Sequence, residues 1–238
     1  MTNRLAERAW VAVPEGALVL VPVGSTEQHG PHLPLDTDSR IATAVAEEAA
    51  RLHRGAGPVL VAPVLAYAAS GEHQSFPGTM SIGHEALEVV LTELVRSLSL
   101  WARRIVIVNG HGGNVSTLAR TVPRLVAEGR DVAWLPCAAE GDAHAGRTET
   151  SLMLHLDPGA VDLSAAVAGN VVPVAELMAS LTAHGVRFVS PSGILGDPTG
   201  ASADEGRAIL EAMAEDAARR IDANSADAQG RLRDPAPP

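Results

Sequence analysis

Short runs of Val, Ile and Leu alternate along this chain with longer segments in which apolar residues recur at helical spacing. The short runs show no regular polar alternation, which is typical of strands that are covered on both faces. They are residues 17–23, 59–64, 104–108 and 131–135. The helical segments are residues 39–53, 84–103, 114–128, 149–155 and 204–223. This alternation predicts an α/β fold in which a mostly parallel sheet carries helices on both faces.

Length and composition agree with one such domain. The chain has 238 residues, of which 46% are hydrophobic and 19% are charged, and this is ample apolar material for a single large core. We expect one domain over residues 1–222 and a flexible tail over residues 223–238, which is polar and then rich in proline. A loop rich in Pro and Gly, residues 190–200, is expected to lie over the functional site.

Charge and cysteine content exclude several classes of protein. The net charge is −10, and no stretch has the clustered basic residues that follow a phosphate backbone, so we expect no nucleic-acid partner. Cys137 is the only cysteine, which excludes an intrachain disulfide and a CxxC-type zinc site. No apolar run is long enough to span a bilayer and no signal-peptide pattern is present, so we expect a cytoplasmic protein with no membrane partner.

Polar residues that could bind a ligand or take part in a reaction follow two of the predicted strands. Residues 24–30 (GSTEQHG) come directly after the first strand, and residues 109–114 (NGHGGN) come after the third. In parallel α/β sheets, ligands bind outside the carboxyl ends of the strands. Both clusters therefore fall where such a fold places its chemistry.

Glu27 and His29 are the first candidate metal-binding pair. In an extended segment alternate side chains point the same way, so the two can converge on one ion. Carboxylate and imidazole ligands together suit zinc, iron(II) or manganese. Either Asp36 or Asp38, at the start of the next helix, could return to the same centre, and an aspartate can bridge two metals. The alternatives for these residues are a solvated surface pair and a helix N-cap.

His111 lies in the second cluster, among glycines that allow a sharp turn and a close approach to a ligand. A phosphate-binding turn is the alternative reading of such a loop. However, the cluster lacks GxGxxG spacing, and the chain has no GxxxxGK[ST]. A histidine in the middle of the loop fits a metal ligand better.

Two further segments supply candidate residues. His144 and Glu149 lie across a loop-to-helix junction. His144 is either structural or an acid–base catalyst, and Glu149 is either a helix-dipole partner or a ligand for a second metal. Glu72 and His73, in the turn-rich segment 70–79, either lie on the substrate side of a pocket or belong to an ordinary connection.

Four stretches, taken together, resemble the creatininase-like amidohydrolase family. They are GSTEQHGPHLPLDTD, GEHQSFPGT, NGHGGN and HAGRTETS, and they occur in the family's order. The resemblance runs from about residue 21 to residue 158 and covers most of the domain. It implies a three-layer α/β/α fold, a binuclear metal centre and a closed homo-oligomer.

The resemblance also implies roles for particular residues. Glu27, His29, Asp38 and His111 match metal ligands of the family, with Asp38 as the bridging ligand, and His144 matches its catalytic histidine. The two divalent ions would be Zn²⁺, Fe²⁺ or one of each, and Mn²⁺ accepts the same ligands. This resemblance, and not the spacing, selects Asp38 as the returning aspartate.

One departure from the family pattern concerns Gly113. Creatininase proper has a ligand glutamate two positions after the histidine that matches His111, and glycine has no side chain to offer there. The second metal is then either less firmly held or bound by another carboxylate, for which Glu149 is the candidate. The same departure argues against creatinine as the substrate.

Within the family, the stretches WARRIVIVNGHGGN and DAHAGRTETS are most similar to the peptidases of the mycofactocin system. This resemblance implies a modified precursor peptide as the substrate and release of its C-terminal Val-Tyr-derived fragment during redox-cofactor biosynthesis. A small cyclic amide or a formamide is the alternative substrate. A non-catalytic binding module is the alternative of another class, whereas a serine hydrolase is not expected because the chain has no GxSxG.

Overall fold

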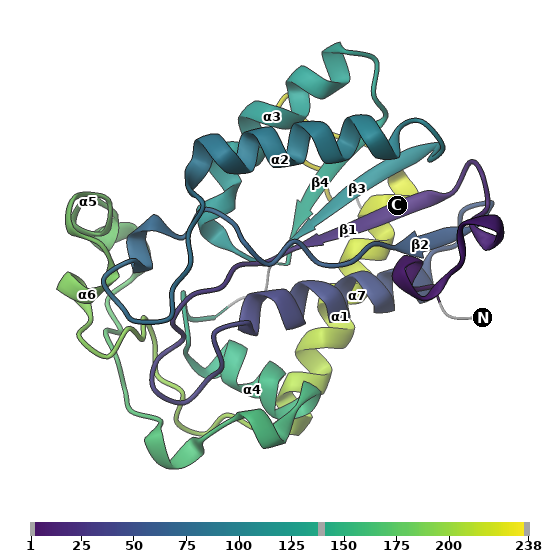
Figure 1. The fold of residues 1–238 in the computed structure, drawn as a ribbon. Coiled ribbons are helices and arrows are strands. Elements are labelled where there is room, and N and C mark those ends of the chain that lie inside the picture. The colour runs from purple at the N-terminus through teal and green to yellow at the C-terminus, as the bar shows by residue number, and fades with distance from the viewer. Residues whose placement is uncertain (1–2, 138–140, 236–238) are drawn as a thin grey trace.

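Parallel strands form the centre of the fold. The computed structural model describes residues 3–137 and 141–235 (Figure 1). In this part of the chain the sheet has four strands in the order β2-β1-β3-β4. They are β1 (Leu18–Val23), β2 (Val59–Val61), β3 (Arg104–Asn109) and β4 (Val132–Pro136). Every neighbouring pair is parallel, so the predicted mostly parallel sheet is confirmed.

Helices cover both faces of this sheet, as Figure 1 shows. One face carries α2 (Gly83–Leu98) and α3 (Val115–Ala127), and the other carries α1 (Thr37–Leu52), α4 (Arg147–Leu156) and α7 (Ala203–Ala223). Along β1, Val19 and Val21 pack in the first layer, whereas Leu18 and Leu20 pack in the second. The alternation follows because successive side chains of a strand point to opposite faces. The two apolar layers confirm the three-layer α/β/α fold.

The limits of several elements differ from those expected. The strand expected over residues 59–64 ends at Val61, and Pro63, which has no N–H to donate, cannot continue a ladder. Two helices were not expected at all: α5 (Val174–His184) and the short α6 (Val186–Val189). The sequence of α5 does carry apolar residues at helical spacing, Val174, Leu177, Met178 and Leu181, so a helix could have been predicted here, although none of its side chains is buried in the structure.

Both ends of the described chain lie along the edges of the sheet. Arg4 forms a parallel bridge with Val61 on β2, and Arg231 forms one with Trp134 on β4. The outer strands are therefore partly covered by segments that are distant from them in sequence.

The segment expected to be a flexible tail, residues 223–238, is mostly exposed where it is described, but part of it pairs with the sheet. Ala223 still belongs to α7, Leu232 is 1% exposed, and its N–H donates to the carbonyl oxygen of Trp134 at 2.8 Å. This backbone pairing joins that stretch to the edge of the sheet, while residues 236–238 lie outside the described residues. The division into a domain and a flexible tail stays a prediction. Across residues 3–137 and 141–235, no helix combines the length and the apolar character needed to cross a membrane.

The carboxyl ends of β1 and β3 bring the two polar clusters together. Val23 pairs with Asn109 in parallel register, so the loops that follow leave the sheet side by side. Glycine at position 110 allows α1 to approach, because a Cβ there would lie only 2.6 Å from the carbonyl oxygen of Asp38. The N-terminus of α1, with Asp38 in its first turn, is thereby set against the ends of the strands.

Candidate metal centre

Asp38 lies between two histidines at this edge of the sheet. Its Oδ1 is 3.0 Å from Nε2 of His29, and its Oδ2 is 3.2 Å from Nδ1 of His111. Asp36, the alternative that the residue pattern left open, instead pairs with Arg40 at 2.8 Å, with about half of its side chain exposed. The structure therefore brings Asp38, and not Asp36, to the other predicted ligands.

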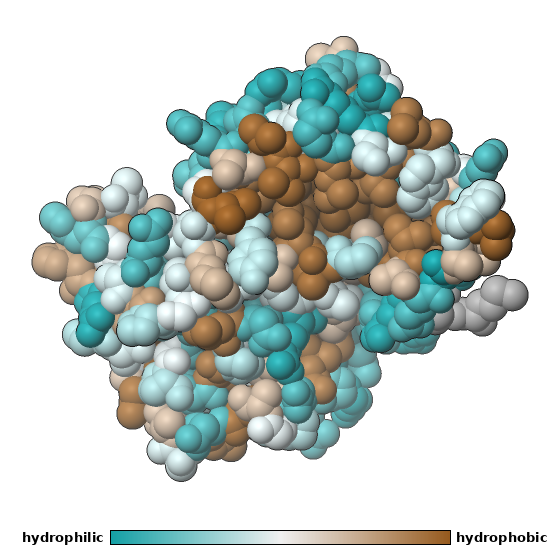
Figure 2. Space-filling model, in the orientation of Figure 1, coloured by the Kyte–Doolittle hydropathy of each residue, from teal (hydrophilic) through white to brown (hydrophobic). Residues whose placement is uncertain are grey.

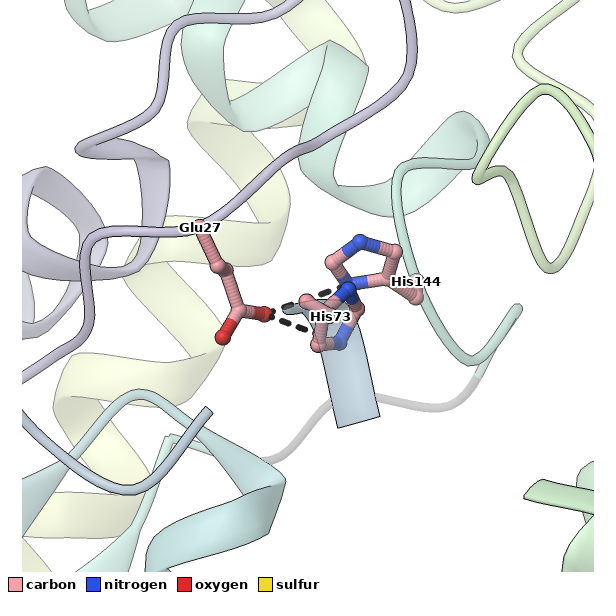
Figure 3. Close-up of side chains that lie close together, drawn as sticks. All are labelled: Glu27, His73 and His144. Atoms are coloured by element: carbon pink, nitrogen blue, oxygen red, sulfur yellow. Dashed lines mark ion pairs between the residues drawn. The ribbon is translucent and has the colours of Figure 1, made fainter. Parts of the chain in front are cut away.

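Glu27 is fully buried in the loop after β1. Its Oε2 lies 3.2 Å from Nε2 of His111. Its Oε1 lies 3.3 Å from Nε2 of His73 and 3.8 Å from Nδ1 of His144, and Figure 3 shows both rings beside the carboxylate. Among the described residues, none donates a hydrogen bond of good geometry to either Glu27 oxygen. A buried carboxylate requires hydrogen bonds or a cation, so Glu27 is suited to binding an ion.

Glu149 reaches the same centre from the first turn of α4. Its Oε2 is 3.8 Å from Nε2 of His29 and accepts a hydrogen bond from the N–H of Ala145 at 2.6 Å. Ala145 has φ +54°, which lies in the left-handed region that residues other than glycine seldom adopt. This turn places the side chains of His144 and Glu149 together, with ligand atoms of His29, His144 and Glu149 all within 4.8 Å of one another.

Gln28, which the sequence analysis did not single out, orders two of the histidines. Its Oε1 accepts from the N–H of Gly30 at 2.9 Å, and its Nε2 donates to the carbonyl oxygen of Gly193 at 3.0 Å. Because these backbone partners have fixed roles, they determine the orientation of the amide. The same Nε2 lies 2.9 Å from Nδ1 of His73. That nitrogen must then accept, which leaves the proton of a neutral His73 on Nε2, facing Glu27.

His144 has its tautomer set in a similar way. Its Nε2 lies 2.8 Å from the backbone carbonyl oxygen of Gln28 and 3.0 Å from the side-chain Nε2 of Gln28. The two protons of that amide are directed to Gly193 and His73, and a carbonyl only accepts, so Nε2 of His144 carries the proton and Nδ1 keeps its lone pair. Burial and the neighbouring His29 lower the pKa of His144 well below its usual value, so the ring is neutral at pH 7. The backbone of His144 also pairs with Leu195, and the predicted loop over residues 190–200 does contact the centre.

Glu72 and His73, the predicted substrate-side residues, lie on a 3-10 helix (Gly71–His73) next to the centre. His73 is 4% exposed and packs within the centre. The Glu72 side chain is 32% exposed, and its Oε1 lies 3.5 Å from Nε2 of His111. The two neighbours thus take different places, one inside the centre and one at its rim.

The charges of the centre favour cations. Burial opposes ionisation of Asp38 and Glu27, yet His29 holds the pKa of Asp38 well below its usual range, and His111 lowers the pKa of Glu27 to about 2. Burial likewise opposes protonation of His29, but Asp38 and Glu149 raise its pKa to about 10. Burial raises the pKa of Glu149 to about 7. Protons on the histidines balance the carboxylates here, and a divalent cation, if bound, would take that role once its ligands lose their protons.

The donor atoms present fit a transition-metal centre. Three sets of side chains bring their ligand atoms within 4.8 Å: Glu27, His29 and Asp38; His29, His144 and Glu149; Glu27, His73 and His144. Nitrogen and carboxylate oxygen donors in this mixture suit zinc, iron(II) or manganese. The residues that the sequence proposed as ligands, together with the proposed catalytic histidine, therefore lie together in one cluster, which is buried except for Glu149 at its side.

The parallel three-layer fold and this cluster define an α/β protein with a buried carboxylate–histidine centre. A family model for creatininase, described as creatinine amidohydrolase, matches residues 5–221. The chain belongs to the creatininase family and is a hydrolase of that family.

Individual proteins show the same similarity. The mycofactocin precursor peptide peptidase of Mycobacterium tuberculosis is 56% identical over 210 residues, which are 85% of this chain and 84% of that protein. A mutant creatininase of the Zn-Zn type has a TM-score of 0.75 and 28% identity, with 93% of this chain and 97% of that chain covered. The structure described as creatininase Mn has a TM-score of 0.73 and 28% identity, covering 93% and 98%.

Proposed function

We propose that this protein is a peptidase that uses two divalent cations to hydrolyse an amide bond of the modified mycofactocin precursor peptide. The observation that carries the proposal is the position of Asp38, whose two oxygens face His29 and His111 separately. A carboxylate with one oxygen toward each of two ligand sets is suited to sharing a pair of metal ions.

The proposed ligands fall on two sides of Asp38. Glu27 and His111 lie on one side, and His29 and Glu149 lie on the other. Zn²⁺ and Fe²⁺ suit these donors, and Mn²⁺ is also accepted; matched creatininase structures of Zn-Zn and Mn types support this choice. Two such cations, when bound, lower the pKa of a bound water and polarise a carbonyl oxygen.

His144 is the proposed acid–base catalyst. Its neutral ring presents the Nδ1 lone pair toward Glu27, at 3.8 Å from Oε1, where it can accept a proton released at the centre and return it to the leaving amine. The backbone carbonyl oxygen of Gln28 accepts a hydrogen bond from Nε2 of His144 and so fixes the orientation of the ring. Hydrolysis then yields a carboxylate and a free amine, with one water consumed per bond.

The substrate follows from the relatives. The sequence of this protein is 56% identical to that of a mycofactocin precursor peptide peptidase over most of both chains, and this similarity supports the same substrate. The products should be the shortened peptide and its C-terminal Val-Tyr-derived fragment, made during redox-cofactor biosynthesis.

Metal analysis and a product assay together test this function. The purified protein should carry about two divalent ions per chain and should cleave the modified precursor peptide rather than creatinine or a formamidopyrimidine. Metal removal or Asp38→Ala should abolish cleavage. Asp36→Ala, a neighbouring aspartate outside the centre, is the matched control and should retain both metal and activity.

Other outcomes separate the alternatives. Cleavage at the normal rate by metal-free protein or by Asp38→Ala would contradict the metal-dependent reaction. Faster turnover of a small cyclic amide or formamide than of the peptide would contradict the proposed substrate but would leave the proposed metal centre intact. A protein that neither binds metal nor cleaves any of these compounds would be a non-catalytic binding module.

The proposal includes a homo-oligomer located in the cytoplasm. Figure 2 shows hydrophobic side chains gathered in a hollow beside α2, and this helix exposes Val89 (62%) and Val90 (36%). Exposed apolar patches of this kind mark protein interfaces. Light scattering coupled to size exclusion should give a mass above the 24.6 kDa of one chain, and a monomer at all concentrations would contradict the assembly.

A further inference from the structure

A carboxylate that the proposed ligand set does not use lies against His111. Glu72 Oε1 is 3.5 Å from Nε2 of His111. The same nitrogen lies 3.2 Å from Oε2 of Glu27 and 3.1 Å from the carbonyl oxygen of Ala69. Ser70 Oγ lies 3.4 Å from this nitrogen as well. One ring nitrogen therefore has four oxygen atoms around it, two of them from carboxylates, and a single N–H cannot satisfy them all. A cation among these atoms would balance both carboxylates.

Space for Glu72 exists because residue 113 is glycine. A Cβ on Gly113 would lie 2.6 Å from Oε1 of Glu72, 2.4 Å from Nε2 of His111 and 2.5 Å from the carbonyl oxygen of Ala69. A side chain at position 113 would displace the Glu72 carboxylate. The room left by the glycine is thus filled by a carboxylate from another segment of the chain.

The backbone around Glu72 is held from two sides. The N–H of Ser70 donates to Oγ of Ser81 at 2.9 Å. On the other side, a Cβ on Gly185, at the junction of α5 and α6, would lie 2.8 Å from the carbonyl oxygen of Glu72. A ligand side chain on a fixed backbone reaches the same position each time, which is what a metal site requires.

We propose that Glu72 is a metal ligand that takes the place left by Gly113, so that one cation of the centre is held by Glu27, His111 and Glu72. This inference rests on the proposed function. It also assigns Glu149 to the other cation, because Glu149 lies 3.8 Å from His29 and not beside Gly113.

Glu72→Gln tests this assignment, because it keeps the shape of the side chain and removes its charge. Metal content after dialysis against a weak chelator, and the affinity for Zn²⁺ in a competition titration, can be measured without any activity assay. The wild-type protein should bind two ions, whereas the variant should keep one and bind the other at least about tenfold more weakly. Gln74→Ala, an exposed residue of the same turn, is the control and should bind both ions normally.

The outcomes distinguish this inference from the function on which it rests. Two ions bound by Glu72→Gln with wild-type affinity overturn the inference and leave the proposed function intact, and a raised KM for the peptide would then place Glu72 on the substrate side. A wild-type protein that binds no divalent ion overturns both. If circular dichroism shows that Glu72→Gln is misfolded, Glu72→Asp is the second variant. Its shorter side chain should weaken the binding of the same ion, and an unchanged affinity for that ion also overturns the inference.

Discussion

The side-chain amide of Gln28 donates to the carbonyl oxygen of Gly193 at 3.0 Å, and this bond ties the loop over the centre to the residue that orders its histidines. The backbone of Gly193 also lies close to the other end of the amide, because a Cβ on Gly193 would lie 1.8 Å from Oε1 of Gln28. Gly193 also has φ +84°, a conformation that favours glycine. The loop and the amide therefore depend on each other.

Gln28→Leu should lower kcat by about 10- to 100-fold while metal content stays the same. Leucine cannot donate to Nδ1 of His73 or hold the loop at Gly193, and loss of groups that orient functional side chains typically has an effect of this size. Steady-state kinetics and metal analysis on the same sample measure both quantities. Pro191→Ala, an exposed change in the same loop, should leave kcat unchanged. A Gln28→Leu enzyme with normal kcat would show that the amide has no positioning role.

Ala145→Val should unfold at clearly lower urea concentration than the wild type, with a loss of at least about 2 kcal/mol. Ala145 is fully buried with φ +54°, and a β-branched side chain is a genuine outlier in that region. Ala145→Gly is the matched variant: it relieves the backbone but loses a buried methyl group, two effects of about 1 kcal/mol each and of opposite sign. Its stability should be close to that of the wild type. Equal stability of the valine variant would contradict the strain.

The metal-free protein should lose stability as pH rises from about 7 to about 9. Despite burial, Asp38 and Glu149 raise the pKa of His29 to about 10 from an ordinary 6.5, and that of His111 is raised as well. A pKa raised on folding stabilises the protein fully below the unfolded value, and this contribution is lost as pH rises through the folded value.

Added Zn²⁺ should reverse this trend, because cations bind more tightly once their ligands have lost protons. Thermal melts at both pH values, with and without Zn²⁺, make the comparison. A Tm of the metal-free protein that increases over this interval is the contrary result.

Glu149→Gln and Glu72→Gln should each weaken the binding of a different metal ion. The two carboxylates lie against different histidines, His29 and His111, so each variant should retain one ion and the double variant should retain neither tightly. Metal titrations of the three variants provide the measurement. Loss of the same single ion in both single variants would mean that the carboxylates share one position.

The architecture and most of the centre could be predicted because they depend on local patterns. Strand runs, their order along the chain and the rule for carboxyl ends predicted that Glu27, His29 and His111 lie at one edge of the sheet, and the structure brings their side chains together there. Their role as metal ligands stays a prediction. Asp36 and Asp38 could not be separated by pattern, since both lie at the start of the same helix and the packing of α1 against Gly110 decides between them.

The remaining contributions are long-range and have no local signal. Gln28 acts through Gly193, a partner 165 positions away. Glu72 meets His111 where Gly113, two residues after that histidine, leaves space for its carboxylate. In such cases the sequence contains the residues but not their proximity, which depends on how loops from separate strands pack together.

The pairing of Arg4 with Val61 and of Arg231 with Trp134 has a consequence for handling the protein. An uncovered outer strand presents free N–H and C=O groups to other chains and promotes aggregation. Trimming either end, or a proteolytic nick just inside it, should therefore reduce colloidal stability before it affects the chemistry of the centre. The two ends of the chain protect the sheet from self-association as well as completing it.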